Sequence, residues 1–349
     1  MKILHAADLH LDTPFVGHTE DAVLYLKKSL LNVPEMLASL CAAHHCDLVL
    51  LSGDLYDGPA SREGIDALKN ALEAMGVPVF ITPGNHDFCA AGSPYLTEVW
   101  PANVHIFTRP AIESVFLPQL DCRVYGAGFS SMDCPPLLEN FRAEGNARYH
   151  IGILHGDPMQ KNSPYNPITQ TQVADSALDY LALGHVHKAD AFTAGSTLCA
   201  WPGCPMGRGN DETGEKGVYI VTLEEAASIA FIPLDTPRFY DWEVEVETSA
   251  QDAVRGLLPP IPDRNFYRIT LTGECEPDGA LSFPEFPFLQ IRDRTVPPVD
   301  LWGCIGEDSL EGVYFRMLHD ALQTADPETA LLAAKISRKI LDGREVKLP

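Results

Sequence analysis

Short apolar runs that stop abruptly at Asp, Asn or His constrain the fold of this chain more than any other feature of its sequence. In the first hundred residues these runs are Lys2–Ala7, Asp47–Ser52 and Val77–Thr82. The stretches between them have the apolar spacing of amphipathic helices, at 21–31, 35–45 and 61–75. This alternation predicts β and α units that share one sheet system. The third helix carries boundary signals, with Ser61 as N-cap and Gly76 just after its end.

Two later apolar runs are also expected to be strands, and both end in histidine. Tyr149–Leu154 precedes His155, and Leu181–Leu183 precedes the segment Gly184-His185-Val186-His187. In open α/β sheets, ligands bind outside the carboxyl ends of the strands. Five strand ends that present Asp, Asn or His therefore predict one shared site.

Five short polar motifs occupy these strand ends. In chain order they are Asp8-x-His10, Gly53-Asp54-x-x-Asp57, Gly84-Asn85-His86-Asp87, His155-Gly156 and Gly184-His185-x-His187. Each is a weak signal alone, because Asp-x-His can cap a helix, the third motif can form a polar turn and a single histidine is more often structural. Their ordered occurrence at successive strand ends favours a functional site.

The donor groups of these motifs are carboxylates, imidazoles and one amide oxygen, and none is a thiolate. Such a set suits Mn²⁺, Fe²⁺ or Zn²⁺. Seven candidate ligands exceed one tetrahedral ion but fit two ions about 3.5–4 Å apart if one carboxylate bridges them. We predict two divalent metal ions, with Mn²⁺ preferred, and Asp54 as the bridging ligand.

Charge and cysteine content limit the classes of partner and compartment. The 25 basic and 48 acidic side chains give a formal charge of −23. This surface repels phosphate backbones, so a nucleic-acid substrate would need positive charge from bound metal, a local patch or a partner protein. Nine cysteines without a CxxC pair indicate a reducing compartment. The N-terminal residues resemble no signal peptide and no apolar run could span a membrane, so we expect a cytoplasmic protein.

The pattern changes near residue 235, which divides the chain into expected domains. Trp242–Glu247 alternates strictly, 249–258 has helical spacing, and Phe266–Thr272 has the pattern of a strand. Two helices are expected beyond them, at 309–323 and 327–342. The predicted domains are a catalytic domain at 1–235, a small α+β domain at 236–300 and a C-terminal helical segment at 301–349.

With these motifs, the chain resembles the calcineurin-like metallophosphoesterases. More narrowly it resembles the SbcD-type DNA break-repair nucleases and, within these, the YhaO-like bacterial exonuclease proteins. The narrower resemblance rests on Ala7–Phe15, Ser163–Pro167, Leu183–Lys188, Trp201–Gly203, Gly207–Gly209 and Glu212–Gly217. It implies an α/β fold in the form of a four-layer α/β/β/α sandwich. It also implies a small α+β capping domain that admits DNA, followed by C-terminal helices.

The resemblance also implies roles for individual residues. One metal ion would lie between Asp8, His10, Asp54 and His187, and the other between Asp54, Asn85, His155 and His185. His86 would act as general acid or transition-state donor without binding metal, and Asp87 would orient it. Asp57 matches the SbcD-like form of the second motif. Lys188 and Arg208 are candidates for contact with substrate phosphate.

The function that follows is a two-metal phosphodiesterase that acts on DNA, as an exonuclease or end-processing nuclease of DNA repair. The resemblance implies an SMC-like coiled-coil ATPase as partner, docked on the C-terminal helices, and is also compatible with a homodimer. The alternative is a phosphatase or phosphodiesterase for small nucleotides, which the negative charge favours. A scaffold without activity is a third interpretation. Histidines outside the motifs are interpreted as structural; they are His5, His18, His44, His45, His105, His150 and His319.

Overall fold

The structure is a computed structural model that describes residues 1–246, 248–275, 280–323 and 326–343. The chain divides into two compact units, Met1–Tyr240 and Asp241–Pro349. Each is described by itself. The further division expected at residue 300 stays a prediction.

The first unit contains two six-stranded sheets with parallel centres. The first sheet has the order β12-β11-β1-β2-β3-β4. Its strands are β1 (Lys2–Ala6), β2 (Leu48–Leu51), β3 (Val79–Ile81), β4 (Val104–Ile106), β11 (Gly217–Leu223) and β12 (Ala227–Pro233). Strands β1 to β4 run parallel, and β11 and β12 add an antiparallel hairpin beside β1.

The second sheet has the order β5-β6-β7-β8-β10-β9. Its strands are β5 (Glu113–Leu117), β6 (Cys122–Gly126), β7 (Tyr149–His155), β8 (Tyr180–Gly184), β9 (Lys188–Ala194) and β10 (Thr197–Gly203). Strands β6, β7, β8 and β10 are parallel, while β5 and β9 are antiparallel edge strands.

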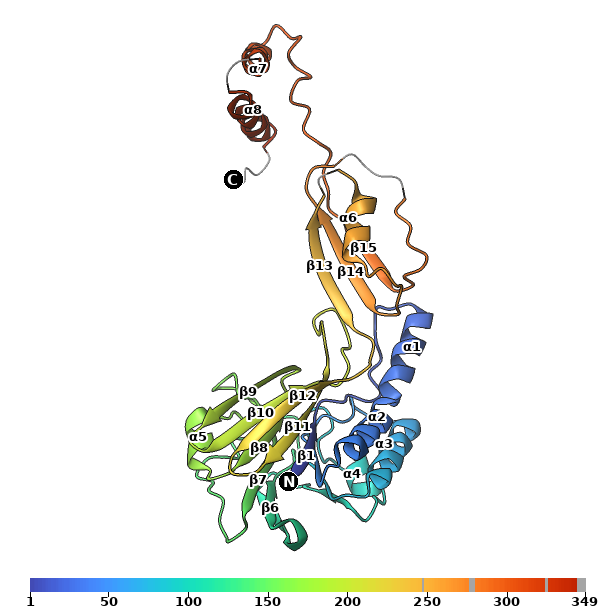
Figure 1. Ribbon diagram of the computed structural model, residues 1–349, viewed down its shortest axis with the longest axis vertical. Helices are drawn as coiled ribbons and strands as arrows, with labels where there is room; N and C mark the ends of the chain where they lie inside the picture. The colour runs from blue at the N-terminus through green and yellow to red at the C-terminus, as the bar shows by residue number, and fades with distance from the viewer. Residues whose placement is uncertain (247, 276–279, 324–325, 344–349) are drawn as a thin grey trace. The chain divides into compact units, whose positions relative to one another are not determined.

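The two sheets pack face to face over one apolar core. Ile3 and Leu50 of the first sheet belong to the same buried cluster as Val124 and Ile153 of the second. Helices cover the outer faces: α2 and α3 lie beside the first sheet, and α5 lies beside β9 and β10 (Figure 1). The α/β fold class and its sandwich of two sheets agree with the prediction. The helices are α1 (Glu20–Leu31), α2 (Val33–His44), α3 (Arg62–Met75), α4 (Pro94–Thr97) and α5 (Gln170–Asp175).

Local capping explains the helix boundaries that the sequence predicted. The hydroxyl of Ser61 accepts a hydrogen bond from the backbone N–H of Gly64, which satisfies one free donor of the first turn of α3. Gly76 ends that helix with a φ of 65°, a left-handed conformation that glycine adopts without strain. Thr19 caps α1 in the same way.

In its described residues, the second unit contains three helices and most of a three-stranded sheet, whose first strand begins at the end of the first unit. The sheet has the order β13-β14-β15, from Phe239–Glu245, Phe266–Thr272 and Leu289–Asp293, and α6 spans Ala250–Leu257. Helices α7 (Leu310–Ala321) and α8 (Pro327–Leu341) pack together around Phe315 and Ala334. None of the helices in the described ranges is both long enough and apolar enough to cross a bilayer.

Candidate metal centre

The predicted motifs follow parallel strands that end at the same edge of the sandwich. Strands β1, β2 and β3 are adjacent in one sheet, and β7 and β8 are adjacent in the other. Asp8 lies two residues beyond β1, Asp54 three beyond β2, and His155 is the last residue of β7. The structure therefore brings together side chains that are distant in the chain, such as His10 and His187, which are 177 positions apart.

Several of these residues have unusual backbone conformations. The φ angles of Asp8, His10 and Asp54 are 52°, 48° and 52°, and that of His185 is 101°. Residues other than glycine rarely adopt positive φ, and such strain is concentrated at functional sites. Gly84, which precedes Asn85, is required for a steric reason, because a Cβ there would collide with the carboxylate of Asp54.

One group of donors combines Asp8, His10 and His187. Their ligand atoms lie within 4.8 Å of one another. Nε2 of His10 is 3.2 Å from Nε2 of His187 and 3.8 Å from Oδ2 of Asp54. Asp8, His10 and Asp54 are buried. Asp8, His10 and His187 thus form one compact group of donors, and Asp54 lies beside its His10.

A second group of donors also includes Asp54. Nε2 of His155 is 2.9 Å from Oδ1 of Asn85 and 3.4 Å from Oδ2 of Asp54. Nδ1 of His185 is 3.2 Å from the same Asn85 oxygen. Because Asp54 contributes to both groups, its carboxylate is in the position that a bridging ligand would occupy.

The protonation of the imidazoles fits a bound cation. Burial is the largest influence on the pKa of His10 and lowers it to about 3, so its imidazole is neutral and can offer a lone pair. Burial also acts to lower the pKa of His155, but the Asp54 carboxylate outweighs it and raises that pKa to about 9. A divalent cation beside Asp54 would take the place of that proton.

Hydrogen bonding also determines which nitrogen of His155 faces the donors. Its Nδ1 lies 3.0 Å from the backbone carbonyl of Ser52, an acceptor to which the ring N–H donates. Once a cation displaces the proton of Nε2, that nitrogen has a lone pair on the side of Asp54 and Asn85. Metal-binding histidines are commonly oriented through their second nitrogen in this way. The donor chemistry and its geometry therefore fit two divalent metal ions.

His86 lies beside the two groups of donors and is partly open to solvent. Its side chain is 44% exposed, and its backbone N–H donates to Oδ1 of Asp54 at 2.8 Å. Its Nδ1 lies 3.0 Å from Oδ1 of Asp57. This hydrogen bond is the main cause of a raised pKa of His86. An exposed imidazole with a raised pKa is suited to donating a proton to a bound substrate.

That Asp87 orients His86 stays a prediction, and the hydrogen bonds of the Asp87 carboxylate are made to other groups. It accepts hydrogen bonds from the backbone N–H of Leu55 at 2.6 Å and of Gly84 at 2.7 Å. The hydroxyl of Tyr95 donates to it at 2.5 Å. Asp87 instead connects the loop after β2 to the loop after β3, and Asp57 makes the contact with His86.

Glu212 is a member of the site to which sequence reasoning assigned no role. Its Oε1 lies 2.7 Å from Nδ1 of His187, so the carboxylate orients that imidazole with Nε2 toward His10. Nη2 of Arg208 donates to the same oxygen at 2.7 Å. The sequence did contain a signal for this residue, because Glu212–Gly217 is one of the segments on which the family resemblance rests. Glu212 itself was not given a role.

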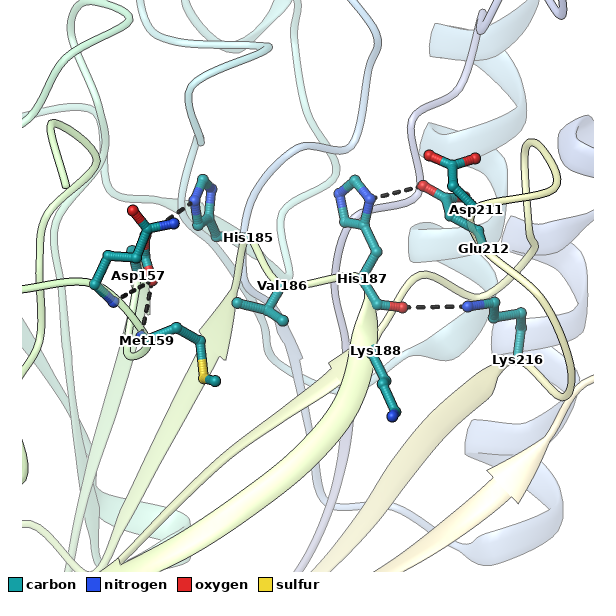
Figure 2. Close-up of a pocket in the computed structure, with 10 residues that line it drawn as sticks. Asp157, Met159, His185, Val186, His187, Lys188, Asp211, Glu212 and Lys216 are labelled. Atoms are coloured by element: carbon teal, nitrogen blue, oxygen red, sulfur yellow. Dashed lines mark hydrogen bonds and ion pairs between the residues drawn. The ribbon is translucent and has the colours of Figure 1, made fainter. Parts of the chain in front are cut away.

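The two predicted substrate-contact residues differ in their surroundings. The side chain of Arg208 is 17% exposed and pairs with Glu212. Lys188 is exposed and lies in the wall of a cavity of about 430 Å³ that His185 and His187 also line (Figure 2). Both residues are near the donor groups, as the prediction requires. Their contact with substrate stays a prediction.

The interpretation of His5 as structural fits its environment. His5 is completely buried, and its two nitrogens contact the hydroxyl oxygens of Tyr180 at 2.7 Å and Ser52 at 2.8 Å. It lies in β1, and its Nε2 is also 3.1 Å from the backbone carbonyl of Leu183 in β8 of the other sheet.

Comparisons with known proteins agree with this site. The model of the calcineurin-like phosphoesterase family matches residues 1–189. The metallophosphoesterase YhaO of Bacillus subtilis is 33% identical over 234 residues, which cover 63% of this chain and 57% of that protein. From the same organism, the SbcD component of the nuclease SbcCD is 23% identical over 268 residues, which cover 63% of this chain and 66% of SbcD.

A further relative is named as a phosphodiesterase of a cyclic nucleotide. The 3′,5′-cyclic adenosine monophosphate phosphodiesterase CpdA of Haemophilus influenzae is 25% identical over 155 residues, 41% of this chain and 55% of that protein. In all three cases the matched part spans less than two thirds of the relative's length.

Proposed function

The chain belongs to the calcineurin-like phosphoesterases, and on that premise we propose that it is a two-metal nuclease that hydrolyses DNA phosphodiesters. The observation that carries this proposal is that both groups of donors contact the carboxylate of Asp54, with His86 beside them. Bound divalent ions would lower the pKa of water and neutralise the phosphodiester oxygens. We favour Mn²⁺ because the donors are carboxylate, imidazole and amide.

The residues of the chain supply the remaining requirements of the reaction. His86 would give a proton to the departing oxygen, a contribution of about 10²–10⁴-fold in general acid catalysis. Asp57 would hold the ring of His86 and its Nδ1 proton. Since enzymes reach about 10⁶-fold or more over the uncatalysed reaction, positioning and charge stabilisation at the donor groups must provide the rest.

Two observations support DNA as the substrate and an ATPase as the partner. The chain is similar to SbcD, a component of a nuclease. Helices α7 and α8 also leave large apolar side chains exposed, among them Leu310 at 88%, Met317 at 67% and Ile340 at 63%. An apolar helix pair suits docking on the coiled coil of an SMC-like ATPase. Such a partner would also supply positive charge to a chain whose net charge is −23.

A second candidate function is hydrolysis of small nucleotides. The net charge of −23 opposes a long polyanion more than a mononucleotide. The similarity to a cyclic-nucleotide phosphodiesterase points the same way.

A comparison of substrates tests the proposal. Wild-type protein, His86→Ala and a control, His44→Ala, would be loaded with Mn²⁺ and given labelled duplex DNA, single-stranded DNA, bis-p-nitrophenyl phosphate and cyclic AMP. We expect preferred cleavage of DNA by wild type and the control. His86→Ala should lose about 10²-fold or more of its turnover while retaining metal. Preferred cleavage of cyclic AMP would favour the second function, and a protein that binds no metal would contradict both.

A further inference from the structure

A buried lysine lies directly behind one of the predicted metal ligands. Lys216 is only 8% exposed, and its ammonium donates to the backbone carbonyl of His187 at 3.4 Å. Among the described residues, the lysines that form ion pairs are Lys69 and Lys339. Lys216 therefore keeps a positive charge that no carboxylate neutralises at close range. Burial of an unpaired ammonium is unfavourable, so a nearby anion would stabilise it.

The acidic residues of the same segment do not serve as that anion. Glu212 is engaged by His187 and Arg208, both at 2.7 Å. Glu215 pairs with Arg238 at 3.1 Å. Asp211 is exposed to solvent. Glu215, which adjoins Lys216 in the chain, and the buried Glu212 thus have other partners. The ammonium of Lys216 remains available to a ligand.

Two cavities meet at Lys216. The first, of about 430 Å³, is lined by His185, His187 and Lys216 among others. The second, of about 620 Å³, is also lined by His187 and Lys216 and extends along Tyr219 and Phe231. Lys188 lines both cavities as well. Figure 2 shows Lys216 reaching the main chain of His187 below its imidazole, with Lys188 extending from the same segment.

The two lysines therefore place positive charge next to the donor groups, in cavities that acidic side chains also line: Asp157, Asp211 and Glu212 in the first, and Asp211 and Glu215 in the second. Lysine binds phosphate as a point charge, with up to three N–H donors. One donor of Lys216 is used by the carbonyl of His187, which fixes the ammonium beside the metal centre and leaves two donors for an anion. The cavity of about 430 Å³ joins this ammonium to His185 and His187, so a substrate held by the donor groups has a path to it.

We propose that Lys216, assisted by Lys188, binds a second phosphate of the substrate, one linkage away from the phosphodiester that is hydrolysed. This inference rests on the proposed phosphodiesterase function and narrows its substrate class to molecules with at least two phosphates. A strand of nucleic acid and a nucleotide with an added terminal phosphate both carry that group. Cyclic AMP and bis-p-nitrophenyl phosphate do not.

Matched chromogenic substrates test this assignment in the full-length, Mn²⁺-loaded protein. The first pair is the p-nitrophenyl ester of thymidine 5′-phosphate with and without a 3′-phosphate. The second pair is the p-nitrophenyl ester of thymidine 3′-phosphate with and without a 5′-phosphate. The leaving group is the same within each pair, so a difference in KM reports the added phosphate. Short DNA strands of increasing length distinguish a strand from a terminal phosphate.

We expect the wild type to favour the bisphosphate member of one pair by about tenfold or more in KM, and Lys216→Met to abolish that preference. Lys216→Arg should keep part of it, and Lys28→Met, at an exposed site on α1, should keep all of it. Melting curves verify that each variant is folded. Methionine nearly matches the shape of lysine without its charge, so a folded variant is expected.

The outcomes separate this inference from the proposed function. Hydrolysis of all four esters by wild type, with no preference for an added phosphate, would overturn the second-phosphate site and leave the hydrolase intact. A preference that survives in Lys216→Met would overturn it equally. Failure of the metal-loaded wild type to hydrolyse any ester or DNA strand would remove the proposed function and, with it, this inference. A preference that grows with strand length would identify nucleic acid as the source of the phosphate.

Discussion

Nδ1 of His86 lies 3.0 Å from Oδ1 of Asp57, which follows Asp54 by three residues in the loop after β2. The other carboxylate oxygen accepts a hydrogen bond from Thr13 at 3.0 Å, so Asp57 is itself held in place. We expect Asp57→Asn to lower kcat about 10- to 100-fold, because it removes the negative charge that helps to raise the pKa of His86. Steady-state kinetics with bis-p-nitrophenyl phosphate measure kcat, and metal analysis measures the metal content.

The metal content of Asp57→Asn should match that of the wild type. Asp66→Asn is the control, since Asp66 lies on α3 in an exposed ion pair with Arg62. It should retain full activity. An Asp57→Asn variant as active as this control would show that His86 needs no partner.

The carboxylate of Glu212 leads to a prediction about metal affinity. Because it fixes the ring of His187 at 2.7 Å, Glu212→Ala should weaken metal binding about 10- to 100-fold, and Glu212→Gln by less. Competition for Mn²⁺ with a fluorescent chelator measures the affinity without reference to catalysis. Glu215→Ala, which changes an exposed acid of the same segment, is the matched control. Equal affinities for the Glu212→Ala and Glu215→Ala variants would contradict the prediction.

The network around Asp87 leads to a prediction about stability. Asp87→Ala would leave the buried N–H groups of Leu55 and Gly84 without their acceptor, and each such group costs about 1–3 kcal/mol. We expect the free energy of unfolding to fall by about 3–5 kcal/mol. Chemical denaturation measures it, and Tyr95→Phe, which removes only one donor to Asp87, should lose less. A variant of full stability with lost turnover would instead support a direct role of Asp87 on His86.

Burial of His5 leads to a prediction about pH. Burial is the main cause that lowers the pKa of His5 to about 3, against 6.5 for the ordinary group. As the pH falls below 6.5, the unfolded chain takes up a proton that the folded chain refuses until about pH 3. The contribution of neutral His5 is therefore complete above that range and is lost at up to about 1.4 kcal/mol per pH unit within it.

A pair of variants isolates this effect. In metal-free protein, the unfolding free energy of His5→Asn should fall less steeply than that of wild type between about pH 6 and pH 4. The difference in slope should correspond to the uptake of about one proton fewer on unfolding. His44→Asn, at the end of α2, should keep the wild-type slope. Identical slopes for all three proteins would show that His5 is protonated in the folded state.

Many of the helix limits and strand ends around the site could be predicted from short stretches of sequence. The helix limits at Ser61 and Gly76 were predictable because a cap and its helix are only a few residues apart. The strand ends were predictable because buried parallel strands are continuous apolar runs. The edge strands of the second sheet were not: β9 and β5 have exposed or half-buried residues throughout, so their sequences lack the apolar signal of the central strands.

The sequence by itself determined the seven candidate donors and the succession along the chain of the strands that they follow. Both depend on residues that are close together in the chain. Only the tertiary structure decided the partners of those donors. Asp87 follows His86 directly, yet its side chain enters the buried loop network, and Asp57, 29 positions away, reaches the imidazole. Glu212 reaches His187 across 25 positions. The direction of a side chain in a loop depends on how distant loops pack against it, and that packing has no periodic signature in the sequence.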